Sequence, residues 1–415
     1  DRHVRKLGLA HQAQAAIDQL STPDRRRLQA YSHGLNAALQ SSRVREQDPF
    51  VLLDVQPASW APWHTLAVER LLAWIATGSL DAPPDAPASV TTFQDVDETL
   101  RRWLHLHGWK RSIAWAVRPN GDPDTTHTAL FQRHVLGAVA TPVVQEVTIN
   151  RPGARSLTSA TLPGGPFLPT GVRGGEAWAS LLQSPARLVR APLDSAALDR
   201  RYERIEPTSG NEQLVRIERL GGDLLLGPAS GADPSNSTPG TSAPADTADT
   251  AKAPSLPRAW VVRWPGFHAA SDLPAWLQRA DLRPPSADSA SFALFAGDGL
   301  RVDGAGDWTI LGSPSVVVRD SARRHVLVGN DEWARHQARA LRAYHEASSR
   351  PTVGPWSASD SSAWAGTLLS AVQPSLGMVA NTAPPYRNAV TYLRNWDHVY
   401  DPSSIGATIF DRWMR

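Results

Sequence analysis

The chain has 415 residues, of which 41% are hydrophobic and 20% are charged, an ordinary globular composition. Lys and Arg number 42 against 40 Asp and Glu, so the net charge of +2 gives no electrostatic basis for binding nucleic acid or an anionic membrane. The absence of cysteine excludes thiol catalysis, disulfides and cysteine-based zinc sites. No apolar run reaches the length of a membrane span, and sixteen tryptophans indicate large apolar contacts in cores or pockets.

Residues 1–80 have a helical pattern. Ser21-Thr22-Pro23-Asp24 is typical of a helix start, because Ser or Thr can cap the helix and Pro suits its first turn. Apolar residues then recur at helical spacing over 28–39 and again over 66–75. This segment is therefore predicted to be mostly helical.

The periodicity changes towards two at Ser112, which predicts strands. Residues 113–117 and 143–149 are rich in β-branched and aromatic residues. Helical patterns return near the end of the chain, so the fold class is predicted to be α+β. Further strands are expected at 177–182, 212–217, 223–226 and 260–264, and further helices at 332–345 and 361–372.

The composition suggests three parts along the chain. Residues 1–80 form the helical segment, and 81–111 form a Pro- and Ala-rich linker or spacer that includes a short amphipathic helix over 95–107. Residues 112–415 form the strand-rich part. Within it, 227–257 is of low complexity and is predicted to be a disordered surface insertion.

The order of motifs after Ser112 is the most informative feature of the sequence. Ser112-Ile113-Ala114-Trp115 is followed by His134, then by Ala160–Pro166 and by Ala177–Ser180. This order resembles the start of the β chain of the penicillin acylases, which are N-terminal-nucleophile hydrolases that cleave amides. Five other segments resemble family motifs in the same order: Ala30–Ala37, Trp60–Trp63, Leu226–Pro228, Ala259–Trp264 and Leu393–Asp397.

The resemblance implies a four-layer αββα sandwich, in which 1–80 corresponds to the end of the acylase α chain and 112–415 to the β chain. It also implies a periplasmic or secreted protein whose precursor is cut into two chains. Because the family is longer at both ends, we expect this sequence to be a fragment that lacks both ends.

An amide hydrolase needs a nucleophile, a base and donors for the oxyanion. In this family the precursor is cut before a serine, whose hydroxyl attacks while its new α-amine acts as base. The resemblance assigns this role to Ser112 and sets the cut between Arg111 and Ser112. A free α-amine has a pKa of about 8, so it is partly neutral at working pH. Taken alone, a serine at this position is much more often a plain loop or strand-edge residue than a nucleophile.

Four further residues are candidates by the same resemblance. The backbone N–H of Leu182 and the side chain of Asn330 would hold the oxyanion, although an Asn after Gly is most often a turn residue. His134 has the position of the family histidine, or is a packed residue at a strand end. Arg335, or alternatively Arg339, would brace the site, although arginine on a helix usually faces solvent.

Several family residues are altered here. The Gly before the nucleophile is Arg111, the Asn after it is Ile113, and 131–133 replace Asn-Asp-Pro. The segment 183–189, at the position of the family's calcium-binding residues, contains no carboxylate. Because Ca²⁺ prefers carboxylate oxygens, we predict that this calcium site is lost, with no other metal or cofactor.

The sequence supports two hypotheses. The first is an acylase that cuts itself before Ser112 and hydrolyses a small N-acyl substrate through an acyl-serine intermediate. Its partners would be that substrate and the two chains of one precursor, without nucleic acid or membrane insertion. β-Lactam antibiotics, acyl-homoserine lactones and N-acyl amino acids all remain open as substrates. The second is a degenerate, non-catalytic acylase-like scaffold that does not mature and at most binds acyl ligands.

Overall fold

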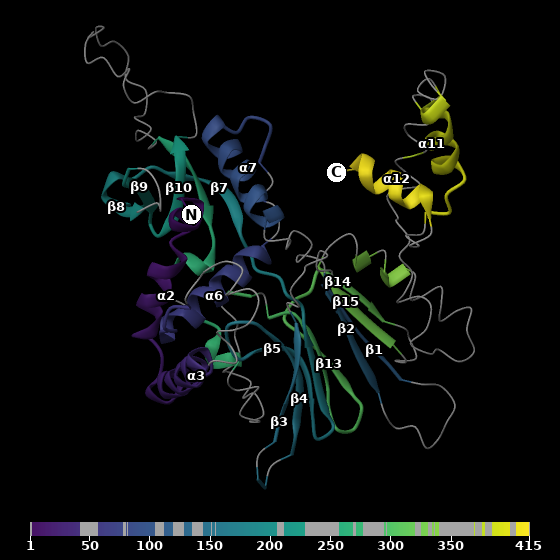
Figure 1. Cartoon of the computed structure of the whole chain (residues 1–415), viewed down its shortest axis with the longest axis horizontal. Helices are drawn as coiled ribbons and strands as arrows, with labels where there is room; N and C mark the ends of the chain where they lie inside the picture. Colours follow the sequence, from purple (N-terminus) through teal and green to yellow (C-terminus); the bar gives the residue numbers. More distant parts are fainter. Residues whose placement is uncertain are drawn as a thin grey trace, which may run out of the picture. The chain divides into compact units, whose positions relative to one another are not determined.

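Three antiparallel sheets and a set of helices make up the part of the chain described by the computed structural model (Figure 1). Two compact units are present, one of Asp1–Arg118 with Thr126–Asn330 and the other of Pro119–Thr125 with Asp331–Arg415. The described residues are 2–41, 57–77, 80, 82–103, 112–118, 128–134, 144–150, 152–153, 155–205, 211–228, 257–268, 271–276, 294–295, 297–319, 325–330, 334–335, 337–339, 369, 376–377, 384–398 and 404–414.

The N-terminal part of the first unit is helical, as predicted. The Ser21 hydroxyl accepts a hydrogen bond from the Asp24 backbone N–H at 3.3 Å, so the predicted cap begins the third helix. The helices are α1 (Arg2–Leu7), α2 (Leu9–Ile17), α3 (Thr22–Gln40), α6 (Pro62–Ile75) and α7 (Ala88–Trp103).

Two helices begin earlier than the sequence predicted. Helix α6 begins at Pro62, where the missing N–H of proline costs nothing, and the His64 Nδ1 atom accepts the Ala61 N–H at 3.0 Å. Helix α7 begins at Ala88 instead of Asp95, inside the stretch expected to be linker. Asn36 and Trp60, which belong to two separate family-like motifs, pair through two hydrogen bonds of 2.6 and 3.0 Å.

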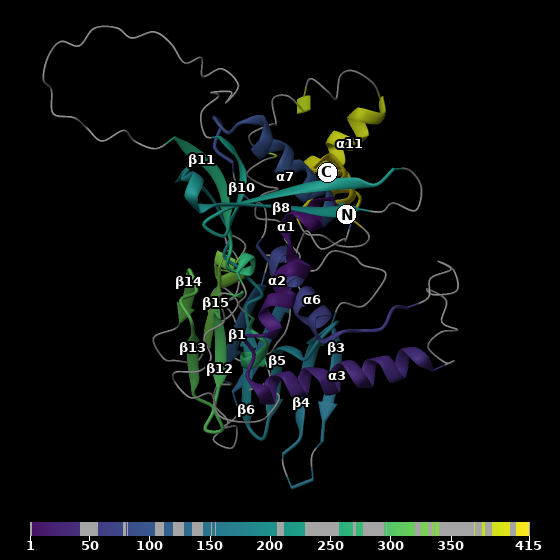
Figure 2. The same cartoon turned by 90° about the vertical axis from the view of Figure 1, so that its left-hand side faces the viewer.

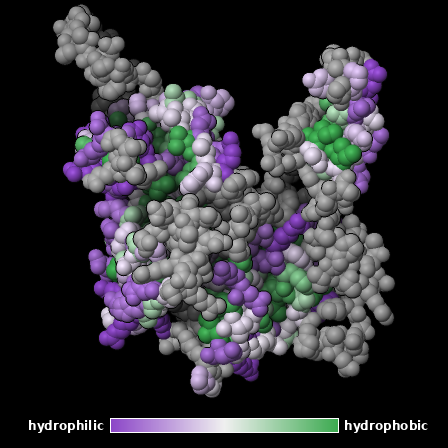
Figure 3. Space-filling model, viewed as in Figure 1, coloured by the Kyte–Doolittle hydropathy of each residue, from purple (hydrophilic) through white to green (hydrophobic). Residues whose placement is uncertain are grey.

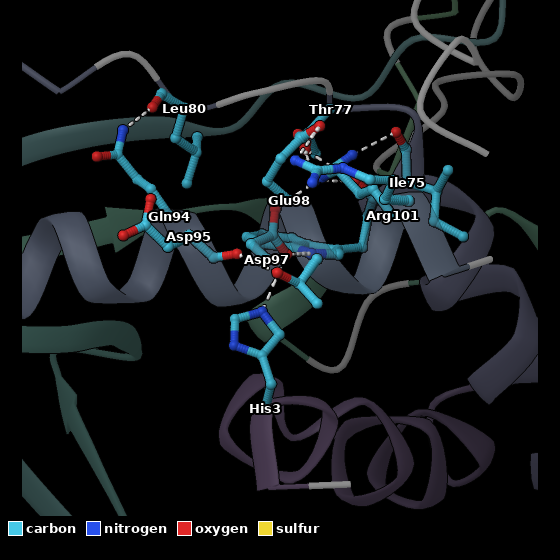
Figure 4. A network of polar contacts seen from close by, with 12 residues as sticks. His3, Ile75, Thr77, Leu80, Gln94, Asp95, Asp97, Glu98 and Arg101 are labelled. Atoms are coloured by element: carbon cyan, nitrogen blue, oxygen red, sulfur yellow. Dashed lines mark hydrogen bonds and ion pairs between the residues drawn. The ribbon is translucent and has the colours of Figure 1, made fainter. Parts of the chain in front are cut away.

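A buried carboxylate joins three of these helices (Figure 4). Asp97 of α7 accepts hydrogen bonds from Trp74 Nε1 of α6 at 2.7 Å and from Arg101 Nε at 2.7 Å. The His3 Nε2 atom of α1 lies 2.9 Å from the same carboxylate. Arg101 also donates to the Ile75 carbonyl at 2.7 Å and the Trp74 carbonyl at 3.0 Å, so it closes the C-terminal end of α6.

A four-stranded sheet of the order β14-β15-β1-β2 carries Ser112. Its two central strands are fully buried, which explains why their sequences are nearly continuous hydrophobic runs. The strands are β1 (Ser112–Val117), β2 (Ala129–His134), β14 (Val316–Arg319) and β15 (His325–Gly329).

A six-stranded sheet of the order β13-β12-β6-β5-β4-β3 packs on the four-stranded one. The alanines Ala114 and Ala116 of β1 contact Ala179 of β6 and Leu300 of β12 within one core, because alternate residues of a strand face the same side. The strands are β3 (Gln145–Ile149), β4 (Leu157–Leu162), β5 (Phe167–Arg173), β6 (Glu176–Ser180), β12 (Gly299–Val302) and β13 (Trp308–Leu311).

Helices cover the other face of the six-stranded sheet (Figure 2). Val68 of α6 lies against Gly164 in the turn between β4 and β5, and Thr65 lies against Gly165. Trp74 of α6 meets Trp264 edge to face at a ring-centroid distance of 5.1 Å. Helical and strand-rich parts of the sequence therefore share one core.

The third sheet, of the order β7-β11-β10-β9-β8, was not foreseen as a separate layer. Its outer strands expose alternating charges, such as Arg200, which donates to Glu218 at 2.9 Å. The predicted strand at 260–264 becomes β11 of this sheet. Its strands are β7 (Arg187–Pro192), β8 (Leu198–Ile205), β9 (Gln213–Leu220), β10 (Asp223–Pro228) and β11 (Arg258–Arg263).

The predicted α+β class is confirmed, with a helical N-terminal segment and two packed sheets. The low-complexity stretch and the predicted helices at 332–345 and 361–372 lie largely outside the described residues. The second unit contains α11 (Pro384–Arg394) and α12 (Ile405–Met414), and hydrophobic side chains gather where these two helices meet (Figure 3). None of the described helices is long and apolar enough to cross a bilayer.

Candidate active site

Ser112 is the first residue of β1, in the middle of the four-stranded sheet. It pairs with His134 across β2, and its Oγ atom lies 2.9 Å from the His134 Nδ1 atom. Only 4% of the serine surface is exposed. The structure therefore brings together the first two residues that the resemblance predicted.

The imidazole of His134 is neutral at physiological pH. Burial lowers its pKa to about 4, because the charged form loses its hydration. Its Nε2 atom is buried and makes no hydrogen bond within the described part of the chain. A neutral ring has one donor and one acceptor nitrogen, so Nδ1 can accept a hydrogen bond from the Ser112 hydroxyl.

Asn330 follows the last residue of β15. Because Ile113 pairs with Gly329, the same register puts Asn330 opposite Ser112 on the neighbouring strand. Its Oδ1 atom accepts the Ser315 N–H at 2.8 Å, and its Nδ2 atom donates to Asp298 at 2.7 Å. A side-chain amide has two N–H donors, so one remains for a further acceptor.

Leu182 lies two residues beyond the end of β6 and is 1% exposed. The neighbouring Leu181 N–H donates to the Asp298 carbonyl at 2.8 Å, and the Gln183 N–H donates to the Leu181 carbonyl at 3.1 Å. Within the described residues the Leu182 N–H makes no hydrogen bond. This leaves it available as a main-chain donor.

A pocket of about 190 Å³ has Asn330 and Asp298 in its wall. The other lining residues are Gln183, Pro185, Ser313 and Ser315. Asp298 was missed by the sequence reasoning. The available signal was the glycine on either side of it, in Gly297-Asp298-Gly299, directly before an apolar strand.

In the sequence, Gln132 of β2 is notable only as a departure from the family pattern. It pairs with Ala114, and its side-chain amide donates to the Ser180 carbonyl at the end of β6. It therefore joins the strand of His134 to the segment that leads to Leu182. Nothing in the residue type alone indicates this role.

Arg335 and Arg339 belong to the second unit and are exposed there. Arg111, at the predicted cut, lies outside the described residues.

The segment 183–189 does not fit the calcium ion that the family implies. Ser184 is 2% exposed, donates to the Leu294 carbonyl and accepts from Trp264 Nε1 at 2.8 Å, so core contacts use its oxygen. The nearby carboxylate of Asp272 accepts the N–H groups of Leu294 and Phe295 at about 3 Å. Among the described residues, no three His, Asp or Glu side chains gather in a way that could hold a metal ion.

Residues 1–180 match the family model described as penicillin amidase. This segment contains both Ser112 and His134 and ends at the last residue of β6. Over residues 1–180 the chain is therefore similar to the penicillin amidase family, whose members are amide hydrolases.

Among solved structures, a thermostable penicillin G acylase from Alcaligenes faecalis in an orthorhombic form is similar to this chain, with 14% identity and a TM-score of 0.43. The alignment covers 70% of this chain and 60% of that one, so the chain spans less than two thirds of that protein. No curated protein sequence matches this chain.

Proposed function

We propose that this protein is an amide hydrolase that cleaves a small N-acyl substrate after cutting itself before Ser112. The observation that carries the proposal is the meeting of three groups at one end of the four-stranded sheet. Ser112 begins β1, His134 lies 2.9 Å from its hydroxyl, and Asn330 follows the strand on its other side. The family match supports the reaction class.

In the proposed reaction the Ser112 oxygen attacks the carbonyl carbon of the amide. Its hydroxyl proton passes to the free α-amine and then to the leaving nitrogen, so the C–N bond breaks and an amine departs. The acyl group stays on Ser112 as an ester. Water then attacks that ester with the α-amine again as base, and the acid leaves.

The Leu182 N–H and the second N–H of Asn330 are the proposed oxyanion donors. Both groups come from ends of strands in packed sheets, so they are held before substrate arrives. Neutral His134 would accept a hydrogen bond from Ser112 and orient its hydroxyl, because its lowered pKa keeps the Nδ1 lone pair free.

We further propose that Arg335 braces the mature site and that the reaction uses no metal or cofactor. The partners would be a small N-acyl compound and the two chains of one precursor, without nucleic acid or membrane insertion. The family resemblance supports a periplasmic or secreted protein. The acyl group and the leaving amine are not specified by the described side chains.

The test is hydrolysis of a panel of chromogenic N-acyl anilides by the full gene product, compared with Ser112→Ala. We expect turnover in the unmodified protein and none above background in the variant, because the nucleophile is gone. Ser159→Ala is the matched control, since Ser159 is also a buried strand serine, but its hydroxyl donates to the Ala160 carbonyl at 3.0 Å. That variant should keep its activity.

Turnover that survives in Ser112→Ala would contradict the proposal. A protein that folds, stays uncut and hydrolyses no member of the panel would favour the alternative of a non-catalytic scaffold that only binds acyl ligands. Calorimetry with the corresponding free acids would then test that alternative directly.

A further inference from the structure

We infer that Asp298 is a positioning residue that holds both proposed oxyanion donors in place. This inference rests on the proposed function and adds a residue that acts through Asn330 and Leu182. Asp298 precedes β12, is 6% exposed, and lies in the wall of the pocket beside Asn330.

The carboxylate of Asp298 fixes the amide of Asn330. Its Oδ2 atom accepts the Asn330 Nδ2 donor at 2.7 Å, while its Oδ1 atom accepts the Ser313 N–H at 2.7 Å. The opposite side of the amide is fixed as well, because Asn330 Oδ1 accepts the Ser315 N–H at 2.8 Å. With both ends bonded, the amide cannot rotate without breaking a hydrogen bond, so its second N–H points in one direction.

The main chain of Asp298 fixes the second donor. Its carbonyl accepts the Leu181 N–H at 2.8 Å, directly before Leu182. The next residue, Gly299, pairs with Ser180 at the end of β6. One residue therefore connects to both donors, through its side chain to Asn330 and through its backbone to the Leu182 segment.

The local chain is shaped to admit this carboxylate. Gly312 has a φ of +66°, which favours glycine, and a Cβ atom added there would lie 2.2 Å from Asp298 Oδ1. The glycine thus allows the backbone to approach, and the following Ser313 N–H reaches the carboxylate. A negative charge near an oxyanion is itself unfavourable, so the benefit of Asp298 must come from geometry.

Asp303 provides a matched control at the other end of the same hairpin. Its Oδ1 atom accepts the N–H groups of Ala305 at 3.0 Å and Asp307 at 2.9 Å, in an exposed turn. Like Asp298, it holds backbone donors of the β12–β13 hairpin. Asp303→Ala therefore measures the cost of loosening the hairpin without touching Asn330.

The experiment measures kcat and KM of the full gene product on the best anilide substrate for Asp298→Ala, Asn330→Ala, the double variant and Asp303→Ala. We expect Asn330→Ala to lower kcat about 10²- to 10³-fold, as for the loss of one oxyanion donor. Asp298→Ala should lower kcat roughly 10²-fold through misplacement of that donor, with KM unchanged. The double variant should be no slower than Asn330→Ala, because the carboxylate acts only through that amide.

Circular dichroism and thermal unfolding establish that each variant folds. If Asp298→Ala does not fold, the kcat of Asp298→Asn is measured in its place. The asparagine keeps the volume and one acceptor oxygen, but its amide group points an N–H towards a neighbouring N–H donor. A folded Asp298 variant with unchanged kcat would overturn the inference while the proposed function stands, and so would multiplicative losses in the double variant. An unmodified protein without turnover would contradict the proposed function and this role with it.

Discussion

At the scale of single residues, the pair of Ser112 and His134 decides what the site can do. The imidazole is held neutral by burial, which lowers its pKa to about 4, and it lies within hydrogen-bonding distance of the Ser112 hydroxyl. A neutral ring can accept a hydrogen bond from the hydroxyl, whereas a charged ring cannot. Burial of this histidine therefore has a cost in stability that depends on pH.

We predict that the free energy of unfolding falls as the pH is lowered from about 6.5 to about 4. In the unfolded chain His134 binds a proton near its ordinary pKa of about 6.5, but in the folded chain only near pH 4, so protonation favours unfolding within this window. The loss is at most about 3 kcal/mol. Urea unfolding at a series of pH values measures it.

The control is His134→Gln, which cannot titrate but keeps hydrogen-bonding atoms. Its unfolding free energy should depend less on pH over the same window than that of the unmodified protein. Identical pH profiles for the two proteins would mean that His134 is not held neutral by the fold.

The sequence could predict the members of the site in part. Ser112, His134 and Asn330 are candidates because they follow one another in a family-like order, and the sheet register places them on neighbouring strands. Asp298 and Gln132 were not found, because their roles depend on bonds to Asn330 and to the Ser180 carbonyl that only the packed sheets create. A carboxylate between two glycines does not by itself indicate a positioning role, because that role depends on contacts with the neighbouring strands.

At the scale of elements, one carboxylate joins α1, α6 and α7. Hydrogen bonds from His3, Trp74 and Arg101 converge on Asp97, which is 4% exposed (Figure 4). Burial alone would raise the pKa of Asp97, but the hydrogen bond with His3 and the charge of Arg101 outweigh it and lower the pKa. The ionised form is therefore the one that stabilises these helices.

We predict that Asp97→Ala lowers the free energy of unfolding by about 3–5 kcal/mol, because it leaves the guanidinium of Arg101 buried and uncompensated. Asp95→Ala is the matched control on the same helix, since Asp95 is exposed, and it should change stability by no more than about 0.5 kcal/mol. Chemical denaturation of both variants measures the difference. Equal effects of the two substitutions would contradict a special role for Asp97.

The sequence predicted the individual helices and strands better than it predicted the separate sheets that the strands form. The cap at Ser21 and the strand at Ser112 follow from local residue types, and both were found. Helix α7 was predicted too short, because its first turn lies in a Pro- and Ala-rich stretch that resembles a linker. The third sheet was missed because β7 and β11 pair across a long separation in sequence, which local patterns do not report.

At the scale of the first unit, residues before and after the proposed cut share one core. Trp74 packs against Trp264, Arg219 Nη2 donates to the Leu7 carbonyl at 2.8 Å, and the Ser184 N–H donates to the Ala76 carbonyl at 3.2 Å. Cutting the chain between Arg111 and Ser112 breaks none of these contacts. The core would thus hold the two pieces together without a peptide bond.

We predict that the cut protein migrates as one species in size-exclusion chromatography under native conditions and separates into two chains only in denaturant. The buried aromatic contacts between the two pieces are the physical reason. Separation of the chains in native buffer would contradict a shared core. Trp74→Ala should weaken the association, since it removes a fully buried side chain from that core.

The measurement that tests the account most directly is the intact mass of the purified full-length gene product under denaturing conditions, alongside Ser112→Ala. We expect two chains, one of which begins at Ser112, and a single uncut chain for the variant. A single uncut chain in both proteins would mean that the serine never becomes a chain terminus. It would contradict the proposed mechanism and leave a scaffold that binds without catalysing.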